Sequence, residues 1–301
     1  MNFTLDQSNL ATSSNTSQTA FRWWSKETVA VVTGANKGIG FELVRKFSQL
    51  ELTVILTARD ITKGKEAVDS LKAIGLKNIE VCQLDITDIS SIKSFVSWLE
   101  KRFGGLDILV NNAGVCFNEI NGNSIDYAET VIKTNFYGPK ILTEALMPLF
   151  RRSASMSRIL NISSQLGAQT QVSNPSLREL LRDEGNLSEK KIDKMICQFL
   201  SDVKMGVWQE KGWPNVWTDY SISKFAVNAY SRLLAKQNIG RNLSVNCFCP
   251  GFTRTAMTGG KGHRTAAEAA EIGSWIALLP PNELPNGEFF KIPAPSITSK
   301  L

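Results

Sequence analysis

Histidine is nearly absent from this chain of 301 residues, in which His263 is the only one. A hydrolase with a Ser-His-Asp triad would have to depend on that residue alone, and a zinc site with several histidine ligands is excluded. Long apolar runs are absent as well, because no uninterrupted run approaches the roughly 18 residues that a membrane-spanning helix needs. The sequence therefore argues against a histidine-rich metal site and against a membrane partner.

Paired cysteines are also lacking. The chain has five, an odd number without the spacing of a disulfide framework or a metal site: Cys82, Cys116, Cys197, Cys247 and Cys249. This pattern is typical of free, mostly buried thiols in a reducing compartment, so we expect a cytoplasmic protein.

Charge of one sign is not concentrated anywhere along the chain. There are 34 basic and 28 acidic residues, a net charge of +6, and the basic residues are scattered. A nucleic-acid groove needs clustered basic residues, so no nucleic-acid partner is expected, and the small positive excess favours anionic small ligands. Hydrophobic residues make up 43% and charged residues 21%, which is typical of a globular protein.

The first 27 residues differ in composition from the rest. Asp6 is the only charged residue before Arg22, and serine, threonine, asparagine and glutamine predominate. Such a segment buries too little apolar surface to order by itself, so residues 1–27 are expected to form a disordered tail. A plastid transit peptide remains an alternative, because the segment is rich in serine and poor in acidic residues, although it lacks early basic residues.

From Thr28 onward, short apolar runs alternate with amphipathic helical patterns. Strands are expected at 29–32, 52–57, 79–84, 106–110, 158–162 and 244–248. Helices are expected at 39–50, 63–74, 89–103, 125–150 and 221–236. Alternation of strands and helices, with strands apolar on both faces, predicts an α/β fold with one Rossmann-type, doubly wound parallel sheet in a single domain, 28–301.

A glycine-rich turn, residues 33–40, joins the first expected strand to the first helix. There, Gly34 can make a tight turn, Gly38 lets the backbone approach a pyrophosphate, and Gly40 permits close packing of helix on strand. The spacing alone is weak and also fits an ordinary turn between strand and helix. In this context it predicts a dinucleotide site with contacts from Gly34, Asn36, Lys37, Gly38, Ile39 and Gly40.

The end of the second strand discriminates between the two nicotinamide cofactors. NAD sites usually place Asp or Glu there for the ribose hydroxyls, whereas a basic residue suits a 2′-phosphate. Here Arg59 follows the strand, and Lys37 supplies a second cation. Two cations near one ribose predict NADP(H), but an Asp60 that pointed inward would weaken that preference.

Further motifs follow the later strands in order. They are Asn111–Gly114, Asn135, the pair Ser163-Ser164, and Tyr220 with Lys224. Together with the glycine-rich turn, Leu84–Thr87 and Pro250-Gly251, these motifs make residues 29–290 resemble the short-chain dehydrogenase/reductase family. The resemblance implies a catalytic set of Asn135, Ser164, Tyr220 and Lys224. It also implies cofactor contacts from Asp85, Ile86, Asn112, Ala113, Gly114, Tyr220, Lys224, Pro250, Gly251, Thr253 and Thr255.

Roles follow from the same resemblance. The catalytic serine is generally the second of the pair, so Ser164 is expected to orient a carbonyl oxygen. Asn135 is expected to hold a proton path to Lys224 through backbone and water. Asp85 is expected to meet the adenine amino group and Asn112 the adenosine ribose.

Elementary chemistry supports Tyr220 and Lys224 independently. Their spacing of four places both on one helix face. A phenol with a pKa of about 10 is a poor acid at neutral pH, and a neighbouring ammonium lowers that pKa by stabilising the phenolate. Tyr220 can then protonate a carbonyl oxygen as hydride arrives from nicotinamide, or take the proton in reverse. The predicted function is NADPH-dependent reduction of a ketone or aldehyde.

Between Ser164 and Tyr220 the chain is longer than in the usual family member, and the excess, 168–217, predicts a helical insertion. After a cap-like Ser188, apolar residues recur at helical spacing: Ile192, Met195, Ile196, Phe199, Leu200 and Val203. The insertion resembles that of monomeric carbonyl reductases, especially the plant subgroup of salutaridine reductase and neomenthol dehydrogenase type. The stripe needs an apolar partner, and the Tyr220 helix is the nearest one in sequence, so we expect a monomer with the insertion packed on that helix. The alternative is that the stripe is itself a dimer interface.

Trp213 and Trp217 end the insertion and admit two interpretations. They are either core residues or, together with Ser164, contacts of a small hydrophobic substrate under an apolar roof. Two other functions also remain open. One is an NAD-dependent alcohol dehydrogenase, which Arg59 and Lys37 argue against. The other is a non-catalytic NADP-binding sensor on the same fold, which would need only the nucleotide half of these motifs.

Overall fold

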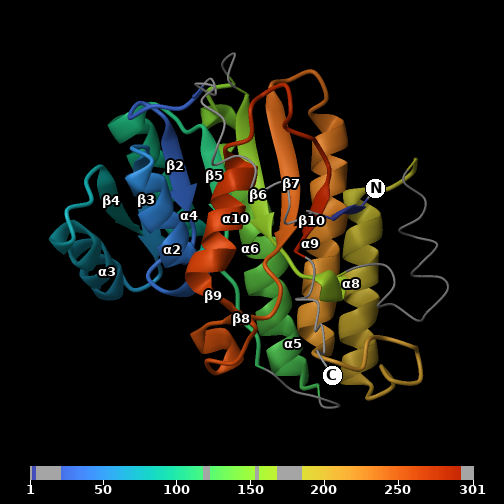
Figure 1. Ribbon diagram of the computed structural model, residues 1–301. Coiled ribbons are helices and arrows are strands. Elements are labelled where there is room, and N and C mark those ends of the chain that lie inside the picture. Colours follow the sequence, from blue (N-terminus) through green and yellow to red (C-terminus); the bar gives the residue numbers. More distant parts are fainter. Residues whose placement is uncertain (1, 5–21, 118–122, 153–155, 168–184, 293–301) are drawn as a thin grey trace, which may run out of the picture.

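Eight strands of the described chain form one parallel sheet. The structure, a computed structural model, describes residues 2–4, 22–117, 123–152, 156–167 and 185–292 (Figure 1). The strands are β1 (Asn2–Thr4), β2 (Val29–Val32), β3 (Thr53–Ala58), β4 (Ile79–Gln83), β5 (Ile108–Asn111), β6 (Ser157–Ile162), β7 (Leu243–Cys249) and β10 (Phe289–Lys291). Their order is β1-β10-β7-β6-β5-β2-β3-β4, and β8 (Thr253–Arg254) pairs separately with β9 (Arg264–Thr265).

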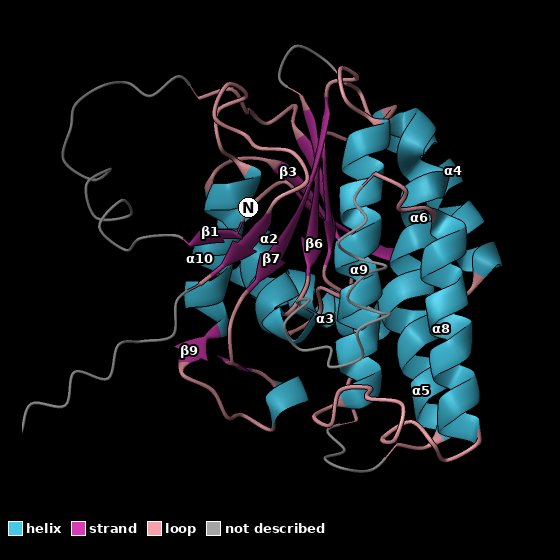
Figure 2. Cartoon of the chain, turned by 90° about the vertical axis from the view of Figure 1, so that its right-hand side faces the viewer, coloured by secondary structure: helices cyan, strands magenta, loops and turns pink. Residues whose placement is uncertain are grey.

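Helices cover both faces of this sheet. Figure 2 shows α2 (Gly38–Gln49) and α10 (Ala266–Ala277) on one side, where α3 (Ile61–Ala73) also packs. The other side carries α4 (Ile89–Phe103), α5 (Ile125–Ile132), α6 (Gly138–Leu146) and α9 (Thr218–Gln237). Every residue of β2, β5, β6 and β7 is therefore buried. The predicted Rossmann-type, doubly wound parallel sheet is confirmed.

The strand order reverses between β2 and β5. From β2 the chain proceeds to β3 and β4 on one side, and from β5 it proceeds to β6, β7 and β10 on the other. Ligands of open parallel sheets bind at such a reversal, beyond the carboxyl ends of the strands. The fold thus places the glycine-rich turn after β2 and the segment after β5 where a dinucleotide would bind.

The predicted elements are present with small shifts at their ends, but the last helix and strand were missed. Helix α10 begins at a reciprocal capping box, in which Glu268 N–H donates to Thr265 Oγ1 at 3.1 Å and Thr265 N–H donates to Glu268 Oε2 at 2.7 Å. The Thr-x-x-Glu pattern before an alanine-rich stretch is typical of a helix N-terminus and could have predicted α10. Strand β10 is short and depends on pairing with β7, which no local pattern indicates.

The expected helix over 125–150 is interrupted. After α5, residues Lys133–Tyr137 form a π-helical turn, α6 follows, and Met147–Leu149 form a 3₁₀ turn. A π-turn inserts one residue into the helical repeat and is frequent at functional sites. Here it contains Asn135, so the single-helix prediction was wrong at the position where the catalytic asparagine is expected.

The prediction of a disordered tail over 1–27 is wrong for the parts that the structure describes. Residues Asn2–Thr4 pair with β10 as an edge strand. The guanidinium of Arg158 lies over the indole of Trp23, with the Arg158 Cζ atom 3.4 Å from the ring centroid. The Trp23 indole N–H also donates a hydrogen bond to Leu278 O at 3.0 Å. Long-range contacts that composition does not reveal hold these residues, and 5–21 lie outside the described residues.

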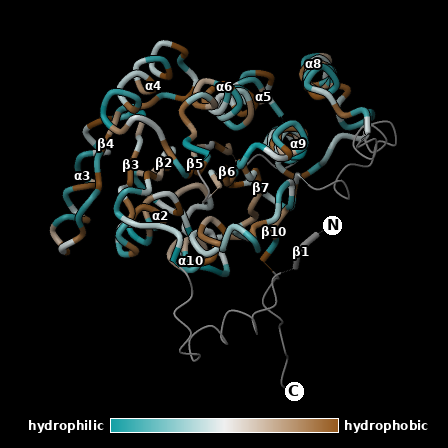
Figure 3. The backbone as a smooth tube through the Cα atoms, turned by 90° about the horizontal axis from the view of Figure 1, so that it is seen from above, coloured by the Kyte–Doolittle hydropathy of each residue, from teal (hydrophilic) through white to brown (hydrophobic). Residues whose placement is uncertain are grey.

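Helix α8 (Glu189–Lys204) is the helix in the described part of the insertion, and it forms an outer layer over α5 and α9 (Figure 3). Ser188 caps it, as predicted, by accepting a hydrogen bond from Lys191 N–H. Its inward stripe is buried: Ile192, Met195, Ile196, Phe199 and Val203. Two polar contacts add to this packing, from Tyr137 to Asp193 at 3.1 Å and from Lys140 to Glu189 at 3.0 Å.

Truncating the centre of this stripe tests how firmly α8 is held. Phe199 is fully buried, and its ring lies 5.1 Å from that of Trp213. We expect Phe199→Ala to reduce the free energy of unfolding by about 3–5 kcal/mol, because a buried aromatic is lost and a cavity remains. Urea denaturation measures this change. Met205→Ala, at an exposed side chain, serves as the control, and a loss below about 1 kcal/mol for Phe199→Ala would mean that α8 is loosely packed.

Candidate active site

The glycine-rich turn after β2 has the backbone that glycine favours. Gly34 has a φ of +59°, and an added Cβ would lie 2.8 Å from the Cα of Ala113. A Cβ on Gly40 would collide with the side chain of Asn112. The turn therefore packs directly against the segment after β5, and larger residues would push the two apart.

Two polar side chains hold these segments together. Thr33 Oγ1 accepts hydrogen bonds from the backbone N–H groups of Asn112 and Ala113, both at 3.0 Å. The Asn112 amide donates to Thr33 O at 2.9 Å and Gly34 O at 3.2 Å. Asn112 thus uses its amide nitrogen to hold the glycine-rich turn. Thr33 was missed as a site residue, although its position at the end of the strand marked it.

The turn after β7 borders the same space. A Cβ on Gly38, whose φ is +62°, would lie 3.6 Å from Thr255 Cγ2. Thr253 is buried and donates its hydroxyl to Pro250 O at 3.2 Å or Gly251 O at 3.3 Å. Of the two threonines expected at the cofactor, the structure brings Thr255 to the glycine-rich turn, whereas the Thr253 hydroxyl stabilises its own turn.

Asp85 and Ile86 follow β4. Asp85 Oδ1 accepts hydrogen bonds from Thr87 N–H at 2.9 Å and from its hydroxyl at 2.8 Å, which closes a local turn. Ile86 is buried, and its carbonyl oxygen would lie 2.9 Å from a Cβ on Gly138. The two residues therefore close the cofactor side of the sheet against the start of α6.

Asp60 does not face the expected ribose position. Its Oδ1 accepts hydrogen bonds from the backbone N–H groups of Thr62 at 3.0 Å and Lys63 at 3.2 Å, so the carboxylate caps α3. Arg59 and Lys37 are exposed, and none of the ion pairs among the described residues uses either. Two cations are thus available to a phosphate near the end of β3 and the glycine-rich turn.

The ammonium of Lys224 is buried at the centre of the site. Only 5% of the residue is exposed, and Nζ donates to Ile162 O, at the end of β6, at 2.7 Å. Burial lowers the pKa of Lys224 to about 8. A Cβ on Gly114 would lie 3.9 Å from this Nζ and 3.2 Å from Asn135 Oδ1, so Gly114 leaves the ammonium accessible from the cofactor side.

Tyr220 lies one helical turn before Lys224, and Lys224 Nζ is 5.4 Å from the centroid of its ring. Burial raises the pKa of the Tyr220 phenol, the thiols of Cys116 and Cys249 raise it further, and a hydrogen bond with Ser164 lowers it. The phenol is therefore protonated at neutral pH in the protein alone. That is the form in which a general acid donates.

The two adjacent serines have different surroundings. Ser163 is buried, and its hydroxyl donates to Asn228 Oδ1 at 2.6 Å. Ser164 is half-buried, its Oγ accepts a hydrogen bond from Leu166 N–H at 3.2 Å, and it lies near enough to Tyr220 to lower the pKa of the phenol. The structure therefore brings Ser164 to the phenol and points Ser163 into the protein.

Asn135 is held by both ends of its side-chain amide. Oδ1 accepts from Val115 N–H at 2.8 Å, and Nδ2 donates to Val115 O at 2.9 Å and to Ser223 Oγ at 3.1 Å. The π-turn that carries Asn135 is thus tied to the segment after β5 and to α9. Both ends of the Asn135 amide are therefore engaged with the protein.

The structure separates the two predicted substrate contacts. Trp213 is 3% exposed, donates its indole N–H to Asp202 Oδ2 at 2.8 Å and packs on Phe199. It is a core residue of the insertion, so its prediction as a substrate contact was wrong. Trp217 is half-buried at the N-cap of α9, three residues before Tyr220, with a φ of +46° that non-glycine residues rarely adopt.

Two further side chains were missed by sequence reasoning. Phe252 is 41% exposed, and its ring lies 6.5 Å from Trp217 and 6.1 Å from His263. Its position directly after Pro250-Gly251 was a usable signal. Cys116 lies near enough to Tyr220 to influence its pKa, but nothing in the sequence brings the two together.

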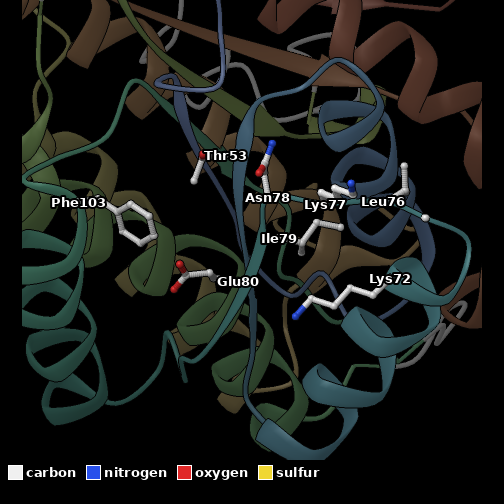
Figure 4. A pocket seen from close by; sticks show the side chains of 9 residues that line it. Thr53, Lys72, Leu76, Lys77, Asn78, Ile79, Glu80 and Phe103 are labelled. Atoms are coloured by element: carbon white, nitrogen blue, oxygen red, sulfur yellow. The ribbon is translucent and has the colours of Figure 1, made fainter.

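A hollow at the far edge of the sheet is unrelated to this site (Figure 4). Lys72, Asn78 and Glu80 are among the residues that line it, near the first residues of β3 and β4. Substrates of parallel α/β sheets bind at the opposite, carboxyl ends of the strands, where Ser164 and Tyr220 lie.

The residues of the carboxyl edge fit a nicotinamide dinucleotide. Gly34 and Gly38 keep a cradle open that side chains would fill. Arg59 and Lys37 offer charge for phosphate. The Lys224 ammonium has three donors, of which Ile162 O takes one among the described residues.

Comparison with known proteins identifies the family. The family model described as short chain dehydrogenase matches residues 28–176 and 208–266. The chain therefore belongs to the short-chain dehydrogenase/reductase family. The unmatched gap contains α8, in agreement with a helical insertion in a family domain.

The individual relatives are reductases and dehydrogenases of carbonyl and alcohol groups. The chain is 40% identical to (+)-neomenthol dehydrogenase of Arabidopsis thaliana, over 87% of this chain and 95% of the relative. It is 39% identical to carbonyl reductase (NADPH) 1 of Homo sapiens, over 87% and 95%. The structure of salutaridine reductase from Papaver somniferum matches with a TM-score of 0.83 and 38% identity, over 87% of this chain and 99% of that one.

The protein is accordingly an oxidoreductase that acts on CH–OH and carbonyl groups with a nicotinamide cofactor, and it resembles the plant reductases of its family. Across the described residues, no helix combines the length and the apolar character needed to cross a membrane.

The buried ammonium makes stability depend on pH. Lys224 has a pKa of about 8 in the fold, whereas an unfolded lysine titrates near 10.4. Between these values the unfolded chain holds a proton that the folded chain has released, so this residue makes the free energy of unfolding rise with pH. Lys224→Met removes that contribution.

Urea unfolding of the cofactor-free protein measures it. We expect the difference in unfolding free energy, wild type minus Lys224→Met, to increase by about 2 kcal/mol between pH 8 and pH 10. The exposed Lys204→Met is the control and should show no such change. A difference that stays flat over this range would contradict a lowered pKa at Lys224.

Proposed function

We propose that this protein reduces the carbonyl group of a small hydrophobic ketone or aldehyde with NADPH, and oxidises the alcohol in reverse, with Tyr220 as general acid and base. One observation supports this most directly: the buried Lys224 ammonium lies on the same helix face as the Tyr220 phenol, and Ser164 lies near enough to lower the pKa of that phenol. A protein that only senses a nucleotide has no need for this arrangement.

The proposed mechanism assigns one task to each side chain. The nicotinamide cofactor supplies hydride when bound. Ser164 orients the carbonyl oxygen beside the phenol, and Tyr220 donates its proton to that oxygen as negative charge develops there. Lys224, charged below a pH of about 8, stabilises the resulting phenolate and binds the nicotinamide ribose. The backbone of Asn135 and water then return a proton by way of Lys224.

NADP(H) is the proposed cofactor. Asp60 caps α3 and so leaves no carboxylate for the ribose hydroxyls, while Arg59 and Lys37 form no ion pair with other described residues. The name of one relative, human carbonyl reductase (NADPH) 1, gives the phosphorylated cofactor as that enzyme's reductant. We therefore disfavour the alternative of an NAD-dependent alcohol dehydrogenase.

For the substrate we propose an apolar molecule that contacts Ser164, Trp217 and Phe252. The rings of Trp217 and Phe252 lie 6.5 Å apart, and Trp217 precedes Tyr220 by three residues at the start of α9. The names of the plant relatives, neomenthol dehydrogenase and salutaridine reductase, support a terpenoid or alkaloid ketone. Because all five cysteines are free thiols, we propose the cytoplasm as the compartment.

Removal of the phenolic hydroxyl tests the proposed acid. Tyr220→Phe should lower kcat for carbonyl reduction by about 100- to 10,000-fold, because the proton donor is lost, and should leave NADPH binding nearly unchanged. NADPH consumption with a panel of ketones and aldehydes measures the rate, and quenching of protein fluorescence measures binding. Tyr230→Phe, on the same helix with its hydroxyl bonded to Glu144, is the matched control. Turnover of Tyr220→Phe within a few-fold of wild type would refute the assignment.

Charge reversal tests the cofactor. Arg59→Asp combined with Lys37→Ala should reduce the preference for NADPH over NADH by at least about 100-fold, since each charge-assisted contact contributes about 1.5–3 kcal/mol. Ratios of kcat/KM for the two cofactors measure the preference. Arg241→Asp with Lys204→Ala, both exposed, is the control. Unchanged selectivity would show that other residues recognise the 2′-phosphate.

We also propose that the protein is a monomer. Helix α8 covers the apolar surfaces of α5 and α9 with its own buried stripe, so those surfaces are not open to a second subunit. Light scattering at micromolar concentration should give a mass near 33.2 kDa. A mass near twice that value would contradict the proposal.

A further inference from the structure

Asn228 extends the polar stripe of α9 by one more turn. Tyr220, Lys224 and Asn228 are spaced by four, so all three face the loop that follows β6. Ser164 lies near enough to Tyr220 to lower the pKa of its phenol, and Lys224 donates to Ile162 O at 2.7 Å. The mechanism proposed above does not use the third member of the stripe.

Asn228 binds the loop on both sides of the reactive serine. Its Oδ1 accepts a hydrogen bond from the Ser163 hydroxyl at 2.6 Å, and its Nδ2 donates to Gly167 O at 3.0 Å. Ser163 and Gly167 are both buried, and Gly167 N–H in turn donates to Ser164 O at 3.0 Å. One amide therefore spans the tight turn in which Ser164 lies.

The same turn has no clearance from α9. A Cβ on Gly167 would collide with the backbone of Lys224 and Phe225. Close contact by itself limits only the distance between the turn and the helix. The two hydrogen bonds of Asn228 also restrict the position of the turn along the helix axis. A displacement of about 1 Å of a reacting group is enough to cost about 100-fold in rate.

From this geometry we propose that Asn228 and Ser163 are positioning residues that hold Ser164 at hydrogen-bonding distance from Tyr220. The paired serines then have separate tasks: Ser163 locks the turn, and Ser164 meets the substrate. This inference rests on the proposed function, because it concerns the alignment of a carbonyl-orienting serine.

A double-mutant cycle between Asn228 and Ser164 tests the inference. Asn228→Leu, similar in size but unable to make either hydrogen bond, should lower kcat by about tenfold or more and leave the KM for NADPH unchanged. In a Ser164→Ala background, where no hydroxyl remains to be aligned, Asn228→Leu should change kcat less than about twofold. If the two losses multiply, Asn228 acts independently of Ser164 and the inference is wrong.

The pH profile of alcohol oxidation supplies a readout that a general loss of stability would not move. The hydrogen bond with Ser164 lowers the pKa of Tyr220. Asn228→Leu and Ser164→Ala should therefore both move the rising limb of kcat/KM to higher pH. Ser231→Ala is the control, since Ser231 is buried on the same helix, accepts a hydrogen bond from Asn161 and donates one to Val227 O. Its profile should coincide with that of wild type.

The outcomes distinguish this inference from the proposed function. If Ser164→Ala retains the kcat of wild type, the role of Ser164 in orienting the carbonyl oxygen is wrong, and with it that part of the proposed mechanism. If Ser164→Ala is impaired while Asn228→Leu is not, only the positioning role fails. Should Asn228→Leu not fold, Ser163→Ala removes a single hydroxyl while Gly167 O keeps its donor. A loss of about threefold that disappears in the Ser164→Ala background is then expected, and full activity would overturn the inference.

Discussion

A single buried ammonium, that of Lys224, is the constraint on which the site depends. A charged group with 5% of its surface exposed needs a fixed partner, and the carbonyl of Ile162 at the end of β6 provides it. This contact joins α9 to the central sheet at one register. It also sets the electrostatics: burial brings the pKa of Lys224 to about 8, low enough to show the cost of desolvation, yet high enough to keep the charge at neutral pH. Tyr220, one turn earlier on the same helix, is positioned by the same contact.

The remaining parts of the site come from elements that meet only at the carboxyl edge of the sheet. The π-turn directs Asn135 to Val115 and Ser223, which links α5 and α6 to the segment after β5 and to α9. An uninterrupted helix would rotate Asn135 away from these partners, because each residue turns the helix by about 100°. The glycine-rich turn packs on Ala113 without clearance for a Cβ. Nucleotide side and catalytic side are therefore built on one continuous segment after β5.

The insertion shapes the site from outside. Helix α8 buries its apolar stripe on α5 and α9, and Trp213 anchors the returning chain by its bond to Asp202. From that anchor the chain reaches Trp217, whose left-handed backbone starts α9. Trp217, three residues before Tyr220, is thus placed by a segment that the shorter family pattern lacks. A bulky residue at a positive φ is strained, and surrounding contacts such as the bond from Ser221 N–H to Trp217 O at 2.7 Å maintain it.

Local patterns were enough to predict the doubly wound sheet and the pair Tyr220 and Lys224: apolar periodicity, glycines at turns, and two side chains four residues apart. The family and the choice of Ser164 followed from the resemblance that the ordered motifs carry. Tertiary structure decided what depends on contacts distant in sequence. It made Trp213 a core residue, turned Asp60 onto α3, broke the helix at Asn135, paired residues 2–4 with β10 and gave Asn228 its two partners. Side-chain direction and the pairing of remote segments follow from packing the whole chain at once, and no local pattern encodes them.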